Sequence, residues 1–189
     1  VTDSQGKFYA PESAWIHADD SRNLTTQKFE SHYFQSDGSD DVKVPVGKLV
    51  IQVSHGPQYE IQKLEVNAST ITNPLVINLK RLNLPTDFGK WWSGDVHVHM
   101  NYTGQYQNKP DRLLQQAKAE DLNFVYNLIV NKEQRIPDIN YFLTTPDKNS
   151  DAETMLLHGQ EFHTSFWGHL GLLNLKDHFI LPDYSGYPM

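Results

Sequence analysis

The sequence predicts a β-sandwich domain followed by an α/β domain. In the first part of the 189-residue chain, from about 42 to 82, short stretches of alternating apolar and polar residues are separated by turns that contain Gly or Pro. This pattern is typical of antiparallel sheets. After residue 86 the pattern changes to strand, helix, strand, which indicates a parallel sheet or barrel. We therefore divide the chain into domains 1–86 and 87–189.

In the first domain, strands are expected wherever alternation runs between two turn signals. The turns are PVG at 45–47 and HGP at 55–57, and the stretch LPTDFG at 84–89 forms the junction to the second domain. The strands predicted in this way are 42–44, 48–53, 59–66 and 75–82. Aromatic-rich pieces between residues 8 and 36 are expected to pair with them.

In the second domain, one helix is expected among strands. Proline is favoured at the first position of a helix, so the helix is predicted to start at Pro110. Its inward side chains would be Leu113, Leu114, Ala117 and Leu122. Residues 123–130 are mostly apolar, as expected for a strand buried on both faces. The strands predicted here are 95–100, 123–130, 155–162 and 169–174, with a long polar loop at 131–153.

Composition excludes several classes of partner. Hydrophobic residues make up 38% of the chain and charged residues 21%, as in ordinary globular domains. The net charge is −7 without any run of lysine and arginine, which argues against nucleic acid or an anionic membrane as a partner. No apolar segment reaches the ~18 residues that a membrane span needs. Because the chain has no cysteine, any metal must be held by nitrogen and oxygen.

The two ends of the chain suggest a piece of a longer protein. The first residues, VTDSQGKFYA, include neither an initiator methionine nor an apolar leader. We therefore expect a processed protein that is secreted or periplasmic, although the lack of cysteine fits the cytoplasm equally well. A closed β/α barrel usually takes about 250 residues, whereas residues 95 to 189 number only 95. The second domain is therefore expected to be an incomplete barrel that a C-terminal segment would complete.

A short strand near the middle of the chain, DVHVH, carries three titratable side chains on one face. Side chains in a strand alternate with period two, so Asp95, His97 and His99 point one way and the two valines the other. Polar groups buried without partners cost a few kcal/mol, so this row needs an explanation. Two adjacent imidazoles can share a cation such as zinc, iron or manganese. The alternative is a pair of hydrogen-bonded core histidines.

A second cluster, HGQEFHTSFWGHLGLLNL at 158–175, favours the metal site. Glu161 and His163 share one face of a predicted strand, and His169 opens the next apolar strand. A carboxylate can bridge two ions, and His169 would add a third imidazole. Glycines at 159, 168 and 171 would let the backbone come close to the site. The simpler interpretation is an aromatic-rich loop with incidental histidines.

Together the two clusters carry a resemblance to a known family. WWSGDVHVHMNY followed by HGQEFHTSFWGHLGLL resembles the PHP (polymerase and histidinol phosphatase) metallohydrolases, in particular the carbaryl-hydrolase-like CehA/McbA branch. NLIVNKEQRIPDINYF is similar to the same branch, and VPVGKLVIQVSHGPQYE resembles the small β-sandwich that often precedes the hydrolase domain there. The resemblance covers most of the chain from about residue 42 onward.

The resemblance implies an incomplete PHP-type β/α barrel with metal-dependent hydrolase activity. Metal-activated water would attack an ester, amide, carbamate or phosphoester bond of a small-molecule substrate. The implied cofactors are one or two divalent ions (Zn, Mn or Fe), with His97, His99, Glu161 and His169 as ligands. PHP proteins carry Thr-Asp-His at the end of the second strand, where this chain has Leu-Ile-Val-Asn at 128–131. A trinuclear centre is therefore not expected.

Further candidates surround these ligands. His163 is a candidate general acid or hydrogen-bonding partner of the site. Asp95 is expected either to accept a ring N–H from His97 or His99, or to close the turn after the preceding glycine. Substrates of α/β proteins usually bind beyond the C-terminal ends of strands, so the end of the second strand supplies substrate-binding candidates: Asn127, Asn131, Lys132 and Arg135. The alternative for these residues is a solvated loop.

Two other functions compete with a PHP-type hydrolase. An amidohydrolase-type barrel also starts with His-x-His, but it needs a bridging lysine where Glu161 stands. A non-catalytic metal-binding or carbohydrate-binding module would bind its ligand without turnover. The sequence is also compatible with a homo-oligomer.

Overall fold

The chain divides into two compact units, Val1–Phe88 and Gly89–Met189. The structure is a computed structural model that describes residues 1–18, 31–87, 89–101, 108–130, 138–164 and 168–177. Its described part is β-rich, with several small strands and one α-helix. The boundary between the units lies close to the one predicted at residue 86. Among the described residues, no helix has the length and apolar character needed to cross a membrane.

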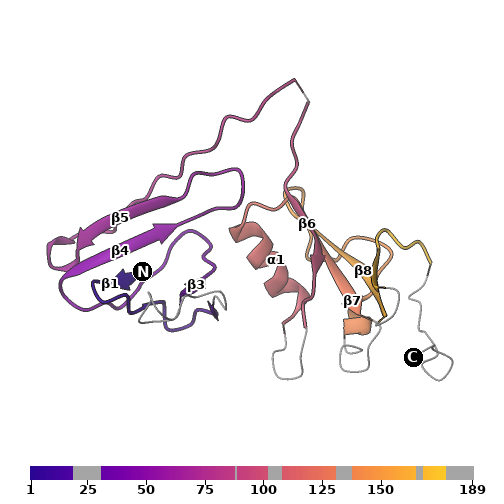
Figure 1. Cartoon of the computed structure of the whole chain (residues 1–189), viewed down its shortest axis with the longest axis horizontal. Helices are drawn as coiled ribbons and strands as arrows, with labels where there is room; N and C mark the ends of the chain where they lie inside the picture. The colour runs from indigo at the N-terminus through magenta and orange to yellow at the C-terminus, as the bar shows by residue number, and fades with distance from the viewer. Residues whose placement is uncertain (19–30, 88, 102–107, 131–137, 165–167, 178–189) are drawn as a thin grey trace. The chain divides into compact units, whose positions relative to one another are not determined.

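The first unit contains two small antiparallel sheets (Figure 1). The strands of the larger sheet, in spatial order, are β1 (Thr2–Asp3), β4 (Lys48–Val53) and β5 (Gln62–Asn67). The smaller sheet pairs β2 (Ile16–Ala18) with β3 (His32–Phe34). The short 3₁₀ turn η1 (Ala68–Thr70) follows β5 directly. β4 forms as predicted, and β5 lies slightly later than its predicted range.

Two strand predictions in this unit are wrong. Residues 42–44 lie outside the strands, and 75–82 contribute only an isolated bridge between Tyr59 and Arg81, flanked by two backbone hydrogen bonds of 2.8 Å. The alternating pattern of 75–82 finds little to pair with, because the opposing chain between the turn at 55–57 and β5 is only a few residues long. A sandwich arrangement of this unit stays a prediction.

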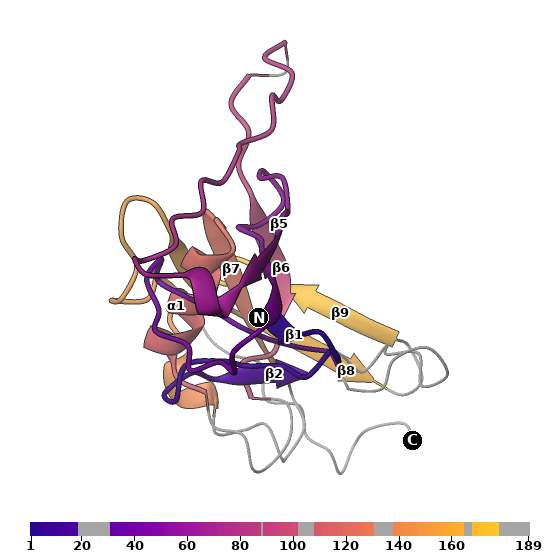
Figure 2. The same ribbon diagram turned by 90° about the vertical axis from the view of Figure 1, so that its left-hand side faces the viewer.

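The second unit is built on a four-stranded sheet of order β6-β7-β8-β9. Its strands are β6 (Gly94–Val98), β7 (Phe124–Val130), β8 (Met155–Thr164) and β9 (Gly168–Leu172). β6, β7 and β8 run parallel as predicted, whereas β9 pairs antiparallel with β8 (Figure 2). Only residues 165–167 separate β8 from β9, and a parallel crossover needs about a dozen or more. The expectation of a wholly parallel sheet is therefore wrong at β9, and barrel closure stays a prediction.

Helix α1 (Pro110–Ala119) starts at the predicted proline and covers one face of this sheet (Figure 1). A proline is tolerated there because its missing N–H would have no partner in the first helical turn. The hydrophobic core joins three helix residues to three from the sheet side: Leu113, Leu114, Ala117, Met100, Val125 and Leu156. Leu122 packs at the edge of this core. The predicted inward face of the helix is confirmed.

The opposite face of the sheet depends on glycines for its close packing. A Cβ added at Gly159 of β8 would lie 2.7 Å from the carbonyl oxygen of Leu172 in β9 and 3.0 Å from a methyl group of Leu128 in β7. A Cβ added at Gly171 would lie 3.5 Å from the other methyl group of Leu128. The glycine at 159 therefore allows β9 to lie close to β8 on the face that carries the candidate site.

Candidate metal centre

Two histidines and one glutamate come together on the face of the sheet opposite α1. His97, His99 and Glu161 each offer one ligand atom, and these atoms lie within 4.8 Å of one another. Nε2 of His99 lies 2.8 Å from Oε2 of Glu161, and Nε2 of His97 lies 3.3 Å from the same oxygen. The histidines belong to β6 and the residue after it, and Glu161 belongs to β8. Because β7 lies between these strands, the three side chains meet across it.

His169 contacts the second oxygen of the same carboxylate. Its Nδ1 lies 2.5 Å from Oε1 of Glu161. The register explains this contact, since Gly171 pairs with Glu161 and His169 stands two residues before Gly171 on the same face of β9. The Glu161 side chain is only 3% exposed, whereas the side chains of His97 and His169 are 53% and 52% exposed. A buried carboxylate thus forms the floor of the site, and two of its histidines are open to solvent.

A backbone carbonyl orients the ring of His99. Its Nδ1 lies 2.8 Å from the carbonyl oxygen of Leu128 in β7. The carbonyl can only accept, so Nδ1 carries the proton and Nε2 faces Glu161. A metal-ligating histidine typically donates its other ring N–H in this way.

Asp95 makes its contact with the backbone of its own strand. Its Oδ1 accepts the backbone N–H of His97 at 2.9 Å. The pairing of β6 with β7 is irregular between Asp95 and Val98, and the carboxylate supplies an acceptor at this irregular place. Asp95 lies inside β6, so this contact differs from the predicted closing of a turn after the preceding glycine. Its role in catalysis stays a prediction.

The residues present fit a divalent cation. Ligand atoms bound at about 2.1 Å from one ion lie roughly 3.0–3.4 Å apart, close to the 2.8 and 3.3 Å between the histidine nitrogens and Glu161. Imidazole nitrogen and carboxylate oxygen suit zinc, manganese and iron. A positive charge beside a buried carboxylate offsets part of the cost of burying it. His97, His99 and Glu161 would hold such an ion, with His169 on the other carboxylate oxygen.

Asn127 lies on the other face of the sheet from these ligands. It is fully buried, its Oδ1 accepts the backbone N–H of Met100 at 3.1 Å, and its Nδ2 donates to Nδ1 of His158 at 3.3 Å. Alternation along β7 places Asn127 with Val125 on the core face and Leu128 on the site face. Both the oxygen and the NH₂ group of its side-chain amide have hydrogen-bond partners inside the protein. We therefore assign Asn127 a structural role in place of the expected contact with substrate.

The buried pair His158 and Asp147 was not among the predicted site residues. Nε2 of His158 lies 3.1 Å from Oδ2 of Asp147. Burial lowers the pKa of His158, although the Asp147 carboxylate opposes this change. Burial raises the pKa of Asp147, but hydrogen bonds from Asn149 and His158 outweigh it and the net direction is down. The signal available in the sequence was a histidine on the core face of an apolar strand, three residues before Glu161.

A second buried carboxylate, that of Asp138, interacts electrostatically with His158 and His99. Its Oδ1 accepts the side-chain N–H of Asn101 at 2.7 Å. The Asn101 amide also exchanges two hydrogen bonds with the backbone of Asn108. Burial raises the pKa of Asp138, opposed by the Asn101 hydrogen bonds and by the charges of His158 and His99. Asn101 therefore joins Asn108, at the start of the helix region, to Asp138.

Several predicted site residues fall outside the described residues. These are Asn131, Lys132 and Arg135. The backbone of His163 pairs with that of His169, but the His163 side chain is also outside the described part. The roles predicted for these four residues stay predictions.

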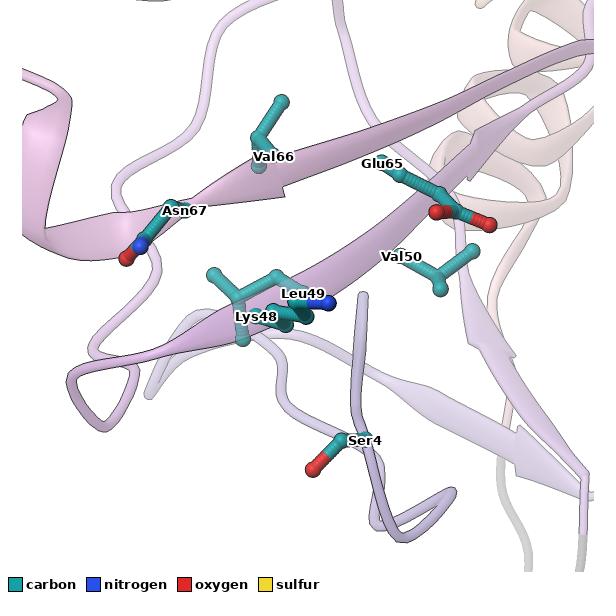
Figure 3. Close-up of a pocket in the computed structure, with 7 residues that line it drawn as sticks. All are labelled: Ser4, Lys48, Leu49, Val50, Glu65, Val66 and Asn67. Carbon is teal, nitrogen blue, oxygen red and sulfur yellow. The ribbon is translucent and has the colours of Figure 1, made fainter.

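A separate hollow of about 420 Å³ lies on the three-stranded sheet of the first unit. Figure 3 shows its lining, which consists of Ser4, Lys48, Leu49, Val50, Glu65, Val66 and Asn67. These side chains do not bring together a set of metal ligands of the kind found in the second unit. The histidine and carboxylate cluster is therefore the site with the clearer chemistry.

Comparison of the chain with family models, with curated proteins and with solved structures gave no match. The resemblance to PHP metallohydrolases consequently stays a prediction. What the site can do follows from the donor atoms and their geometry.

Proposed function

We propose that this chain is a metal-dependent hydrolase of the PHP type. Its second unit would hold one or two divalent ions through His97, His99, Glu161 and His169. The observation that supports this proposal is the Glu161 carboxylate, which meets imidazoles on both of its oxygens. The imidazoles come from two strands that are far apart in the sequence, so the convergence is a property of the fold. A divalent ion held there would supply the Lewis acidity that activates water toward an ester, amide, carbamate or phosphoester.

The protein's own groups would keep the ligands in place and leave room for a substrate. Glu161 is buried and the Leu128 carbonyl fixes the ring of His99. The exposed rings of His97 and His169 leave one side of the site open to a small molecule. The cluster lies toward the C-terminal ends of the parallel strands, because Glu161 pairs with Val130, the last residue of β7. Substrates of α/β proteins bind at this end.

The wider architecture is part of the same proposal. The unit β6-α1-β7, with its two parallel neighbouring strands, is the kind of unit from which a β/α barrel is built. A sandwich in the first unit, a secreted or periplasmic location and a homo-oligomer belong to the proposal as well.

Calorimetric titration with Zn²⁺ and Mn²⁺, followed by assays with a panel of ester, carbamate and phosphoester substrates, tests this function. We expect binding and turnover in the parent chain, and loss of both in the double variant His97→Ala, His99→Ala. The matched control His17→Ala, His55→Ala removes two histidines of the first unit and should leave both unchanged. Turnover that persists in the first double variant would exclude the proposed mechanism. Metal binding without turnover on any substrate would instead support a metal-binding module.

A further inference from the structure

Two adjacent residues of β7 hold the chain directly after β6 from opposite faces of the sheet. The Leu128 carbonyl accepts the ring N–H of His99 at 2.8 Å, and the Asn127 side chain accepts the backbone N–H of Met100 at 3.1 Å. His99 and Met100 are consecutive, so both bonds act on the same short segment. The regular pairing of β6 with β7 is interrupted between Asp95 and Val98. Met100 lies two residues beyond the end of β6, and the Asn127 amide gives its backbone N–H the acceptor that a neighbouring strand would otherwise supply.

The direction in which the Asn127 amide points is decisive for this contact. Its oxygen must face Met100, because a backbone N–H needs an acceptor. Its NH₂ group must then meet an acceptor on the other side. Nδ1 of His158 lies there at 3.3 Å, and it can accept only if it carries no proton.

Asp147 determines which nitrogen of His158 carries the proton. Its Oδ2 lies 3.1 Å from Nε2 of His158 and accepts the proton of that nitrogen. Its Oδ1 is occupied by the backbone and side-chain N–H groups of Asn149, at 2.9 and 2.8 Å. Asn127, His158 and Asp147 are 0%, 3% and 6% exposed, so water cannot easily replace any of these partners. The four groups form one chain of hydrogen bonds with a single direction, from Met100 to Asp147.

Reversal of this direction would disturb the segment that carries His99. If Nδ1 of His158 held the proton, it would face the NH₂ group of Asn127, and two donors would oppose each other. Rotation of the amide would relieve this conflict, but it would turn the NH₂ group toward the N–H of Met100. Either arrangement leaves a buried donor without an acceptor, which is unfavourable.

We propose that Asn127, His158 and Asp147 are positioning residues of the metal centre, which fix the main chain at Met100 and thereby the place of His99. This inference rests on the proposed function. None of the three residues would touch the ion or the substrate. They would act through His99, in the way that partners of metal-ligating residues act in known metal sites.

The first test compares two asparagine variants of the same strand region. Asn123 precedes β7, its Oδ1 accepts the backbone N–H of Ser93 before β6 at 3.0 Å, and its Nδ2 donates to Glu153. It thus performs at the distant end of the strands the task that Asn127 performs near the site. We expect Asn127→Leu to weaken the affinity for Zn²⁺ about 10–100-fold, and Asn123→Leu to leave it within about threefold of the parent. Equal affinities in folded Asn127→Leu and the parent would overturn the proposal.

A second variant decides the matter if Asn127→Leu does not fold. In Asp147→Asn, the side-chain oxygen can keep both bonds from Asn149, so the introduced NH₂ group faces Nε2 of His158. We expect the ¹⁵N resonances of His158 to show a proton on Nε2 in the parent and on Nδ1 in the variant. The backbone amide resonance of Met100 should shift and the Kd for Zn²⁺ should rise in parallel. An unchanged Met100 resonance and an unchanged Kd, in spite of the altered tautomer, would contradict the positioning role.

The same spectra separate failure of this inference from failure of the proposed function. A parent chain that binds no Zn²⁺ would refute the metal site. The ring ¹⁵N resonances of His99 and the amide resonance of Met100 would still report the arrangement of the segment in the metal-free protein. Shifts of both resonances in Asp147→Asn, absent in Asn123→Leu, would support the positioning role. Their absence in both variants would refute it.

Discussion

Replacement of Gly159 by alanine tests whether the close approach of β9 to β8 supports both the fold and the site. The added methyl group would lie 2.7 Å from the carbonyl oxygen of Leu172, and Cβ atoms essentially never approach another heavy atom within 3.0 Å. The obstructing atom belongs to the backbone of β9, so no side-chain rotation can relieve the contact. Overpacking of this kind typically costs about 1–3 kcal/mol. In a unit of this size, each kcal/mol lowers Tm by roughly 4–8 °C.

Thermal unfolding followed by circular dichroism measures this effect, and Gly171→Ala provides the matched control. Gly171 faces the same Leu128 side chain, but its added Cβ would lie 3.5 Å away, at an ordinary van der Waals distance. We expect a lowered Tm for Gly159→Ala and a change of less than about 1 kcal/mol in the free energy of unfolding for Gly171→Ala.

The consequence of Gly159→Ala for the metal site follows from the same geometry. If β9 moves away by a few tenths of an ångström, His169 moves away from Glu161, and the affinity for Zn²⁺ should fall in Gly159→Ala more than in Gly171→Ala. A Gly159→Ala chain with the Tm and the affinity of the parent would show that β9 does not lie where the structure places it, and the reasoning would fail.

Three further predictions concern the core and the buried titratable groups. Leu156→Ala, at a fully buried core position, should lower the free energy of unfolding by about 2–5 kcal/mol in urea titrations, whereas the neighbouring Met155→Ala, at a 40% exposed position, should cost much less. Because burial lowers the pKa of His158, the contribution of this residue to the free energy of unfolding should be fully present above pH 6.5 and decline below it, since the unfolded chain takes up a proton that the folded chain resists. In His158→Gln the dependence of the unfolding free energy on pH should be weaker in this range. An identical pH dependence in the variant and the parent would contradict the reasoning. Because burial raises the pKa of Asp138, Asp138→Asn should stabilise the protein at neutral pH by up to about 1 kcal/mol. Urea unfolding at lower pH should show a smaller gain, because the carboxyl of the parent becomes protonated there. A variant less stable than the parent at neutral pH would refute this prediction.

Local sequence patterns predicted the elements that local physics determines. Helix α1 begins at its proline and buries the side chains that its periodicity selected. β7 coincides with the apolar run at 123–130. The failures arise where pairing partners are distant. Residues 75–82 have the alternation of a strand but lack a long partner. The direction of β9 depends on its short connection to β8, because a parallel crossover needs about a dozen residues or more.

The sequence predicts the part of the candidate site that follows from the alternation of side chains along a strand. His97, His99 and Glu161 share one face because each strand alternates, and the structure brings them together. Asn127 was expected to face the substrate but lies on the core face, because β7 is apolar on both faces and its pattern does not say which face an asparagine occupies. The contact between His158 and Asp147 depends on how a long loop returns to β8. No local pattern encodes that return.

The two halves of the candidate metal centre close loops of very different length. Glu161 and His169 are 8 residues apart (169 − 161) in a single hairpin, whereas 64 residues separate His97 from Glu161. Loop-closure entropy grows by about 0.6 kcal/mol for each doubling of length, so the longer closure costs about 2 kcal/mol more. The hairpin half should therefore assemble first and separate last. In the folded protein the pairing of β6, β7 and β8 keeps the longer loop closed, so this difference sets the order in which the two halves form during folding.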